Sequence, residues 1–411
     1  MDEISRYAVG LDIGTSTVRA VVASVMKDGR LNVIGSAEVP NSGMRRGAVV
    51  NLAGPAQAID KVLGEVERMG GYEINAATIS INGSQILSTR TEGKIAAVTA
   101  NHEINQEDLA RLTDVALEGE IPANQEILDV VPLQYVLDGQ AGIKDPLGMV
   151  ALKIEMQANV VSTLVSTYDN LRKASESANV TPEGVVPSVV AAARAVLNER
   201  QMENGVAVVD IGASTTGIAI YEESDLQYVG VVPVGSNNIT NDLAVMLAID
   251  TEVAEEIKRR FATGSFGENE GAVVIRWRGK DLHFERDQID EVVQARLDEI
   301  LELVHKELKK ARYEQRLPEG IVLTGGGARM RDIDKFVRMT LGMSVKIGAP
   351  TGLSGLVEKI QKPEFSAAVG LMLTSAENEG RAAAPKKSRK KSGKKSADKG
   401  PGLLKKFFGK F

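Results

Sequence analysis

The sequence contains no cysteine and no long apolar run, and each absence removes a class of protein. Without cysteine there is neither a disulfide nor a thiolate zinc site, which fits a reducing compartment such as the cytoplasm. No run of about 18 consecutive apolar residues occurs, so we expect no membrane-spanning helix. The acidic start from Met1 to Arg6 lacks the apolar segment of a secretory signal, so we expect none.

The phosphate-binding motif of P-loop enzymes is also absent. No Gly-x-x-x-x-Gly-Lys-Ser/Thr pattern is present, so the chain is not a P-loop protein. Its 411 residues, 43% hydrophobic and 25% charged, have the composition of an ordinary globular protein and are enough for two domains.

Acidic residues outnumber basic ones in the body of the chain, whereas basic residues dominate its C-terminus. From Arg381 onward, 12 Lys or Arg stand against one acid, Asp398, whereas the whole chain has a net charge of −6, so the rest carries −17. An acidic body argues against nucleic-acid binding, and we expect no nucleic-acid partner. The basic end predicts an anionic partner, with a solvated tail that aids solubility as the alternative.

An internal repeat organises the body. The segment Tyr7–Thr17, which contains Asp-Ile-Gly-Thr-Ser-Thr, is echoed 198 residues later by Val206–Thr215, which contains Asp-Ile-Gly-Ala-Ser-Thr. Both copies continue as β-rich segments joined by short polar turns, and helical patterns follow, for example over Glu252–Phe261 and Asp287–Tyr313. The duplication predicts an α/β protein with two similar lobes that face each other.

The two repeated turns have the chemistry of a phosphate site. Small residues with free N–H groups and hydroxyls follow a buried strand, and phosphate oxygens need converging donors without bulky side chains. The strand-end carboxylates, Asp12 and Asp210, are suited to Mg²⁺, which keeps water ligands and takes few carboxylates. One such turn is weak evidence, because any β-hairpin can contain it, but the pair predicts a clamp on a triphosphate.

A third segment suits the nucleoside. Gly320–Thr324 reads as a buried strand that ends in three glycines before a helix expected from Met330. Glycines allow a flat ring to approach the backbone, although tight strand–helix packing explains them equally well. Glu255 and Lys258 lie one helical turn apart and are candidates to reach the ribose, with a surface ion pair as the alternative.

The C-terminal residues form an amphipathic pattern. At helical spacing the Leu and Phe side chains gather on one face and the Lys side chains on the other, which predicts a helix that lies on an anionic bilayer. The predicted membrane-binding residues are Leu403, Leu404, Lys405, Lys406, Phe407, Phe408, Lys410 and Phe411. Docking in a protein groove is the alternative. So short a helix binds weakly, which favours many copies acting together in a polymer.

Together these segments resemble the FtsA family, the actin-like bacterial cell-division proteins that tether the tubulin-like FtsZ ring to the membrane. The order Asp-Ile-Gly, Asp-Ile-Gly, Thr-Gly-Gly-Gly is that of actin-like ATPases in general. More specific are Ile121–Pro132 and Asp138–Met149, which resemble the subdomain inserted in this family.

The resemblance implies a two-lobed actin-like (ribonuclease H-like) ATPase fold with an inserted subdomain and a C-terminal amphipathic helix. The expected parts are a first lobe (1–84 and 166–200), the inserted subdomain (85–165), a second lobe (201–375) with a smaller subdomain at about 240–310, a disordered basic linker (376–400) and the membrane helix (401–411). It implies ATP and Mg²⁺ as cofactors, with metal contacts from Asp12 and Asp210. The expected nucleotide contacts are Gly14, Thr15, Ser16, Thr17, Gly212, Ala213, Ser214, Thr215, Gly235, Glu255, Lys258, Gly325, Gly326 and Gly327.

The implied function is anchoring of the FtsZ ring at the cytoplasmic face of the cell membrane, at the division site. The implied partners are the C-terminal tail of FtsZ, bound within about 240–310, further copies of the chain in a filament, later division proteins and anionic lipid. No single FtsZ-contact residue or catalytic residue is assigned.

The second phosphate turn departs from the superfamily pattern. Ala213, Ser214 and Gly217 stand where more glycines and a later Asp are usual, and Ser236 replaces a second glycine after Gly235. Val186–Ser188 lacks the Gln or Glu that orients the attacking water. We therefore expect ATP binding with slow hydrolysis at best.

Three other functions share the nucleotide-binding turns. A pilus-assembly actin homologue often has Asp-Ile-Gly-Ala-Ser in its second turn but fits the insertion less well. A cell-shape filament usually carries its membrane segment at the other end. A sugar or acetate kinase needs a catalytic carboxylate over an acceptor pocket, for which the sequence offers no candidate.

Overall fold

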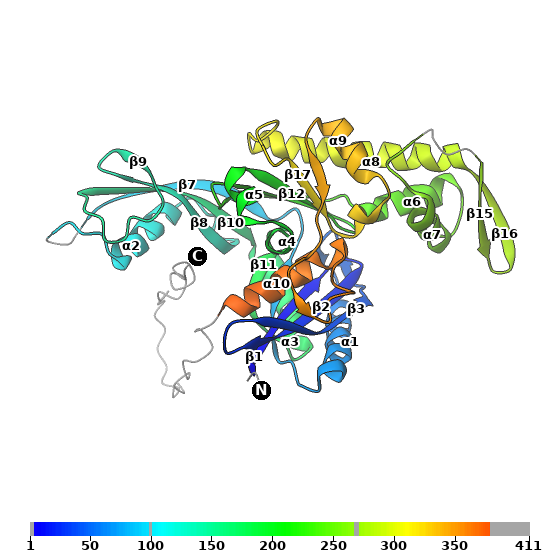
Figure 1. Ribbon diagram of the computed structural model, residues 1–411, viewed down its shortest axis with the longest axis horizontal. Helices are drawn as coiled ribbons and strands as arrows, with labels where there is room; N and C mark the ends of the chain where they lie inside the picture. Colours follow the sequence, from blue (N-terminus) through cyan, green and yellow to red (C-terminus); the bar gives the residue numbers. More distant parts are fainter. Residues whose placement is uncertain (1–3, 98–100, 267–270, 379–411) are drawn as a thin grey trace. The chain divides into compact units, whose positions relative to one another are not determined.

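The computed structural model describes residues 4–97, 101–266 and 271–378 (Figure 1). The chain divides into two compact units. The larger comprises Met1–Ser88, Asn124–Leu128 and Val161–Ala376, and the smaller includes Thr89–Ala123 and Asp129–Val160. Within the described ranges, no helix is both long enough and apolar enough to cross a bilayer.

The larger unit contains two sheets with matching strand arrangements. The first has the order β11-β6-β1-β2-β3-β19 and the second the order β14-β13-β12-β17-β18. In the first sheet β1, β2 and β3 are antiparallel, and β6 and β11 lie on the other side of β1 and run parallel to it. In the second sheet β12, β13 and β14 are antiparallel, and β17 and β18 lie on the other side of β12 and run parallel to it. The predicted duplication is therefore confirmed as two lobes of one topology. The strands of the first sheet are β1 (Ile4–Ile13), β2 (Thr17–Met26), β3 (Leu31–Pro40), β6 (Ala76–Ile81), β11 (Thr181–Pro187) and β19 (Ser354–Gly355). Those of the second are β12 (Val206–Ile211), β13 (Thr216–Glu222), β14 (Asp225–Val232), β17 (Ile321–Thr324) and β18 (Val345–Ile347).

The central strands are apolar along most of their length because both of their faces are covered. β12 has the sequence Val-Ala-Val-Val-Asp-Ile, and all of its residues except Asp210 are buried. The β13–β14 turn places Glu223 and Ser224 at φ 53° and 64°, the geometry of a type I′ hairpin. The polar turn expected from the sequence is thus a tight two-residue connection.

Two helices pack at the centre of the larger unit, α4 (Ser188–Val196) and α10 (Ser366–Glu377) (Figure 1). A Cβ on Gly370 of α10 would lie 1.6 Å from the carbonyl oxygen of Ala191 in α4. A Cβ on Gly10 of β1 would lie 2.1 Å from the carbonyl oxygen of Ala368. Glycine at both positions therefore lets α10 approach the first sheet and α4 closely.

The first lobe also contains α1 (Ala53–Gly70), α3 (Val165–Ser177) and the short pair β4 (Met44–Arg45) and β5 (Ala48–Val49). α1 buries Ile59, Val62, Leu63 and Val66 and ends at Gly71, whose φ of 71° is the left-handed conformation that closes many helices.

The second lobe also contains α6 (Ser236–Met246), α7 (Thr251–Phe261), β15 (Ala272–Trp277), β16 (Lys280–Glu285) and α8 (Arg286–Lys310). The apolar stripe on α8 is confirmed, since Leu297, Leu301, Val304 and Leu308 are all buried in one core with β12 and α7. The helix α5 (Glu199–Asn204) leads into this lobe.

The prediction that a helix begins at Met330 is wrong. The three glycines lead into a 3₁₀ turn, η1 (Gly326–Arg329), and the α-helix α9 (Ile333–Leu341) begins three residues after Met330. Asp332 has a φ of 56°, so the backbone changes direction before α9 can begin. A second 3₁₀ turn, η2 (Pro363–Phe365), precedes α10.

The smaller unit is built on a four-stranded sheet in the order β7-β10-β8-β9. Its strands, which extend partly into the larger unit, are β7 (Leu87–Ala96), β8 (Gln125–Leu137), β9 (Gln140–Ile143) and β10 (Lys153–Leu164). The helix α2 (Gln106–Leu117) begins with a capping box in which Asn105 and Asp108 satisfy each other's backbone N–H groups. The residue limits of the domains expected from the sequence stay predictions.

Candidate functional site

The two repeated turns have the same backbone geometry. In the first, the Gly14 N–H donates to the Thr17 carbonyl oxygen at 3.1 Å, and in the second the Gly212 N–H donates to the Thr215 carbonyl oxygen at 2.9 Å. A Cβ would lie 2.7 Å from that oxygen at Gly14 and 2.9 Å from it at Gly212. Each turn therefore needs its glycine, and the remaining turn residues (Thr15, Ser16, Ala213 and Ser214) are partly exposed at the tips.

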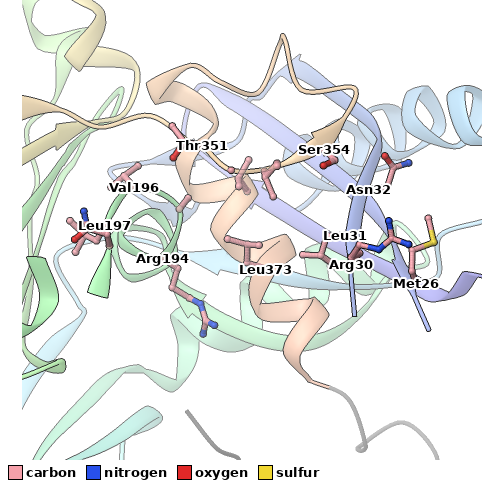
Figure 2. A pocket seen from close by; sticks show the side chains of 15 residues that line it. Met26, Arg30, Leu31, Asn32, Arg194, Val196, Leu197, Thr351, Ser354 and Leu373 are labelled. Carbon is pink, nitrogen blue, oxygen red and sulfur yellow. The ribbon is translucent and has the colours of Figure 1, made fainter. Parts of the chain in front are cut away.

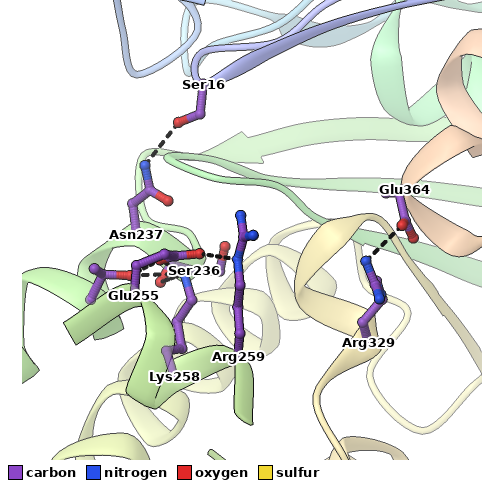
Figure 3. A network of polar contacts seen from close by, with 9 residues as sticks. Ser16, Ser236, Asn237, Glu255, Lys258, Arg259, Arg329 and Glu364 are labelled. Atoms are coloured by element: carbon purple, nitrogen blue, oxygen red, sulfur yellow. Dashed lines mark hydrogen bonds and ion pairs between the residues drawn. The ribbon is translucent and has the colours of Figure 1, made fainter. Parts of the chain in front are cut away.

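Two asparagines link these turns across the lobes. The Asn237 amide at the start of α6 donates to Ser16 Oγ at 2.9 Å, as Figure 3 shows. The Asn82 amide, directly after β6, donates to Thr215 Oγ1 at 3.0 Å. The sequence reasoning missed both residues. For Asn82 a signal existed, because β6 is parallel to β1 and the ends of neighbouring parallel strands meet at one edge of a sheet.

The two carboxylates expected to hold a metal interact electrostatically. Burial and the negative charge of Asp12 raise the pKa of Asp210 to about 7, against the opposing influence of Arg19. Burial likewise raises the pKa of Asp12, while Arg19 beside it and a hydrogen bond with Ser80 lower it. Such repulsion between neighbouring carboxylates is relieved by a cation.

The pair fits a hard divalent cation such as Mg²⁺. Within residues 4–97, 101–266 and 271–378, no group of three or more His, Cys, Asp or Glu side chains is arranged so that it could hold a metal ion by itself. A metal at Asp12 and Asp210 would therefore complete its shell with water or with oxygens of a ligand, which is the usual habit of Mg²⁺.

The three glycines after β17 have different surroundings. A Cβ on Gly325, whose φ is 84°, would lie 2.1 Å from Asp210 Oδ1, and a Cβ on Gly327 would lie 2.3 Å from the Ile211 side chain. Gly326 is exposed and faces open space. Close packing on β12 therefore explains Gly325 and Gly327, whereas Gly326 leaves room on the surface for a flat ring.

The start of α6 packs on the second turn. The Ser236 and Asn237 N–H groups donate to the carbonyl oxygens of Gly212 and Ala213 at 2.9 and 2.7 Å. A Cβ on Gly235 would lie 2.6 Å from the Gly212 carbonyl oxygen. Gly235 is thus needed to bring α6 against the turn.

Glu255 and Lys258 form more than a surface ion pair. Lys258 Nζ contacts Glu255 Oε2 at 2.6 Å and donates to Thr240 Oγ1 at 2.8 Å and to the Ser236 carbonyl oxygen at 3.3 Å (Figure 3). Burial lowers the pKa of Lys258 despite this ion pair. Burial also raises the pKa of Glu255, but its hydrogen bonds with Lys258 and Thr240 outweigh that effect, so the pKa lies below its usual value. The network ties α7 to the start of α6, beside the second turn.

A cavity of about 680 Å³ has a different set of lining residues (Figure 2). It is lined by the ends of β2 and β3, by 194–198, by Thr351–Ser354 and by α10, and by none of the predicted nucleotide or metal residues. A second cavity of about 400 Å³, lined by Phe266 and acidic side chains, follows α8. The donors and carboxylates of the two turns, and not a large cavity, mark the candidate site, and Asn82 and Asn237 tie each turn to the opposite lobe.

The predicted membrane-binding residues, Leu403 to Phe411, lie outside the described residues, as does most of the expected linker.

Comparison with known proteins gives the family. Residues 207–370 match the family model described as cell division protein FtsA, and residues 83–162 match the one described as the SHS2 domain inserted in FtsA. Curated proteins named cell division protein FtsA are 35% identical in Pseudomonas aeruginosa (90% of this chain and 89% of that protein) and 30% identical in Escherichia coli K12 (89% and 90%).

Solved structures share the fold at lower identity. A PilM–PilN type IV pilus biogenesis complex aligns with a TM-score of 0.64 and 20% identity over 90% of this chain and 98% of the other. MreB5 of Spiroplasma citri bound to ADP aligns with a TM-score of 0.54 and 14% identity over 90% and 96%. The two lobes with their duplicated strand order thus have the actin-like ATPase fold, as predicted. With these matches and its inserted subdomain, the chain belongs to the FtsA family of cell-division proteins.

Proposed function

We propose that this cell-division protein binds ATP and Mg²⁺ between its two lobes, polymerises on the cytoplasmic face of the membrane at the division site and anchors the FtsZ ring there. The observation that carries the nucleotide part is the pair of equivalent turns, Gly14–Thr17 and Gly212–Thr215, linked across the lobes beside two carboxylates with raised pKa values.

Each part of the site has a role in this proposal. The turns donate backbone N–H groups and hydroxyls to phosphate oxygens, and Asp12 and Asp210 hold Mg²⁺ through its water shell. Gly326 offers an open surface for the adenine, beside Gly325 and Gly327, and the Glu255–Lys258 network faces the ribose. A bound Mg²⁺ supplies charge neutralisation for the phosphates. The ADP in the related MreB5 structure supports a nucleotide in this fold.

Hydrolysis is slow in this proposal. Val186 and Pro187 end β11 and Ser188 begins α4, so no carboxylate or amide side chain stands at the expected water-orienting positions. Without a general base or a positioned water the nucleotide is held without rapid turnover.

The membrane part of the proposal depends on the C-terminal segment. A Lys face attracts an anionic surface by about 1 kcal/mol per nearby Lys, and a Leu/Phe face inserts at the interface. One short helix holds weakly, so a polymer that presents many copies gives stable residence. An exposed apolar group on the smaller unit, Leu147, Met149, Val150 and Leu152, supports contact with another copy.

We place the FtsZ tail in the subdomain at about 240–310, with later division proteins as further partners. That range contains the cavity of about 400 Å³ along α8, and it is separate in sequence from the membrane helix. Capture of the chain by an immobilised FtsZ tail peptide tests this part. Loss of capture after deletion of β15 and β16 alone, with the remainder folded, is the expected result, and unchanged capture contradicts the assignment.

The proposal as a whole is tested by deleting Leu403–Phe411. The truncated protein should no longer sediment with vesicles that contain anionic lipid, while its affinity for ATP stays that of the full chain. Binding of the full chain should rise cooperatively with its concentration. A truncated protein that still sediments contradicts the membrane role, and a full chain that binds no ATP contradicts the nucleotide role.

The pilus-assembly, cell-shape and kinase alternatives are not favoured, because the sequence matches FtsA over about 90% of its length and includes the inserted subdomain. The likeness to PilM and MreB5 is one of fold. The kinase alternative predicts phosphate transfer from ATP to a sugar or to acetate. We expect no transfer to any member of a panel of these acceptors.

A further inference from the structure

Two side-chain hydrogen bonds cross between the lobes in a reciprocal arrangement. Asn82 of the first lobe donates to the hydroxyl of Thr215 in the second turn, at 3.0 Å. Asn237 of the second lobe donates to the hydroxyl of Ser16 in the first turn, at 2.9 Å (Figure 3). Each phosphate-site turn thus has one hydroxyl held by an amide from the opposite lobe.

The direction of the Asn82 bond follows from its second contact. Asn82 Oδ1 accepts from the Gly83 N–H at 2.8 Å, so this oxygen faces a donor and the amide nitrogen faces Thr215. Thr215 is 3% exposed, which makes this bond the more sheltered of the two.

A hydroxyl that accepts from an amide keeps its own proton to donate. Ser16 and Thr215 each have one O–H group, and in the part of the chain that the structure describes neither finds a protein acceptor. Phosphate oxygens accept hydrogen bonds and do not donate them, so two oriented O–H groups are what a triphosphate requires.

We propose that Asn82 and Asn237 are positioning residues that couple closure of the lobes to the orientation of the two hydroxyls. This inference rests on the proposed nucleotide site. Because each amide belongs to the opposite lobe, the hydroxyls are oriented only when the lobes are closed. A nucleotide that accepts from both hydroxyls stabilises the closed arrangement, and closure strengthens its binding by the same factor.

Substitution by Asp separates this role from simple packing. Asp has the shape of Asn but only accepts, so Asn82→Asp or Asn237→Asp captures the hydroxyl proton and adds a negative charge near the phosphates. Alanine removes the orienting donor and leaves the hydroxyl free to rotate. We expect ATP affinity to fall about threefold to tenfold for each Ala variant and at least about tenfold further for each Asp variant. Asn75→Ala, at an exposed Asn of the first lobe, is the matched control and should bind as the unaltered protein does.

Closure is measured on the same variants with two spin labels. The chain has no cysteine, so Met69→Cys in the first lobe and Met339→Cys in the second, both exposed, are labelled uniquely. With Mg²⁺ and ATP the parent should show one narrow distance distribution, and the Asn variants a broader one that extends to longer distances. The melting temperature of each variant checks that it is folded.

The possible outcomes distinguish a failure of the positioning role from a failure of the proposed nucleotide site. If the unaltered chain binds no ATP, the proposed nucleotide site is wrong. If the unaltered chain binds ATP and the Ala and Asp variants match it in affinity and distance distribution, the positioning role is overturned. Asp variants that bind no worse than Ala variants overturn it as well.

Discussion

Replacing Asp210 by Asn should stabilise the protein in the absence of metal and nucleotide, and the gain should depend on pH. Burial and the charge of Asp12 raise the pKa of Asp210 from 3.8 to about 7. A carboxyl whose folded pKa is raised binds its proton more tightly in the folded state, so stability falls as pH rises from about 4 to 7. The full rise in the pKa of Asp210 corresponds to a loss of about 4 kcal/mol in the free energy of unfolding. Asp210 is partly exposed and shares its repulsion with Asp12, so we expect about 1–3 kcal/mol.

The assay is urea unfolding of the parent and Asp210→Asn in metal-free buffer at pH 8 and pH 5. At pH 8 the variant should unfold at the higher urea concentration, and at pH 5 the gap should shrink to less than about half, because Asp210 of the folded parent is then protonated. Asp60→Asn, at an exposed carboxylate of α1, should show no such gap. A variant less stable than the parent at both pH values, or a gap as large at pH 5 as at pH 8, would refute the reasoning.

The other predictions concern the glycines and the Lys258 network. Gly325→Ala should lower the free energy of unfolding by about 2–4 kcal/mol, because its Cβ would meet Asp210 Oδ1 at 2.1 Å at a φ of 84°. Gly326→Ala, which faces open space, should unfold within about 0.5 kcal/mol of the parent but bind ATP more weakly. Equal destabilisation of both in urea titrations would contradict this division. Lys258→Met should reduce ATP affinity about tenfold in equilibrium titrations, because it releases α7 from the Ser236 carbonyl. Unchanged affinity would show that the Lys258 network does not contribute to nucleotide binding.

The sequence predicted what depends on local pattern. The repeat of Asp-Ile-Gly gave two turns of equal geometry because strand, glycine and following Thr act within a few residues of one another. The apolar stripe of α8 was readable from its spacing for the same reason. Asp138 and Gly139 form a two-residue hairpin turn at φ 48° and 91°, which an Asp-Gly pair favours.

What the sequence could not give depends on distant packing. The start of α9 is set by the left-handed Asp332, which no local preference requires. The cross-lobe contacts of Asn82 and Asn237 join residues far apart in the chain, so their partners could not be read from the neighbouring sequence, although the place of Asn82 at the end of a strand was a signal for the site. Gly325 and Gly327 pack on β12 whereas Gly326 faces open space, and this difference depends on the position of β12 in the folded protein.

The central claim is that the two repeated turns hold a triphosphate between the lobes. A crystal structure of the protein with Mg²⁺ and a non-hydrolysable ATP analogue tests it most directly. We predict phosphates between Gly14–Ser16 and Gly212–Ser214, the metal water shell against Asp12 and Asp210, and adenine beside Gly326. A nucleotide found instead in the 680 Å³ cavity near Arg30 and Arg194, with no phosphate between the two turns, would contradict the account.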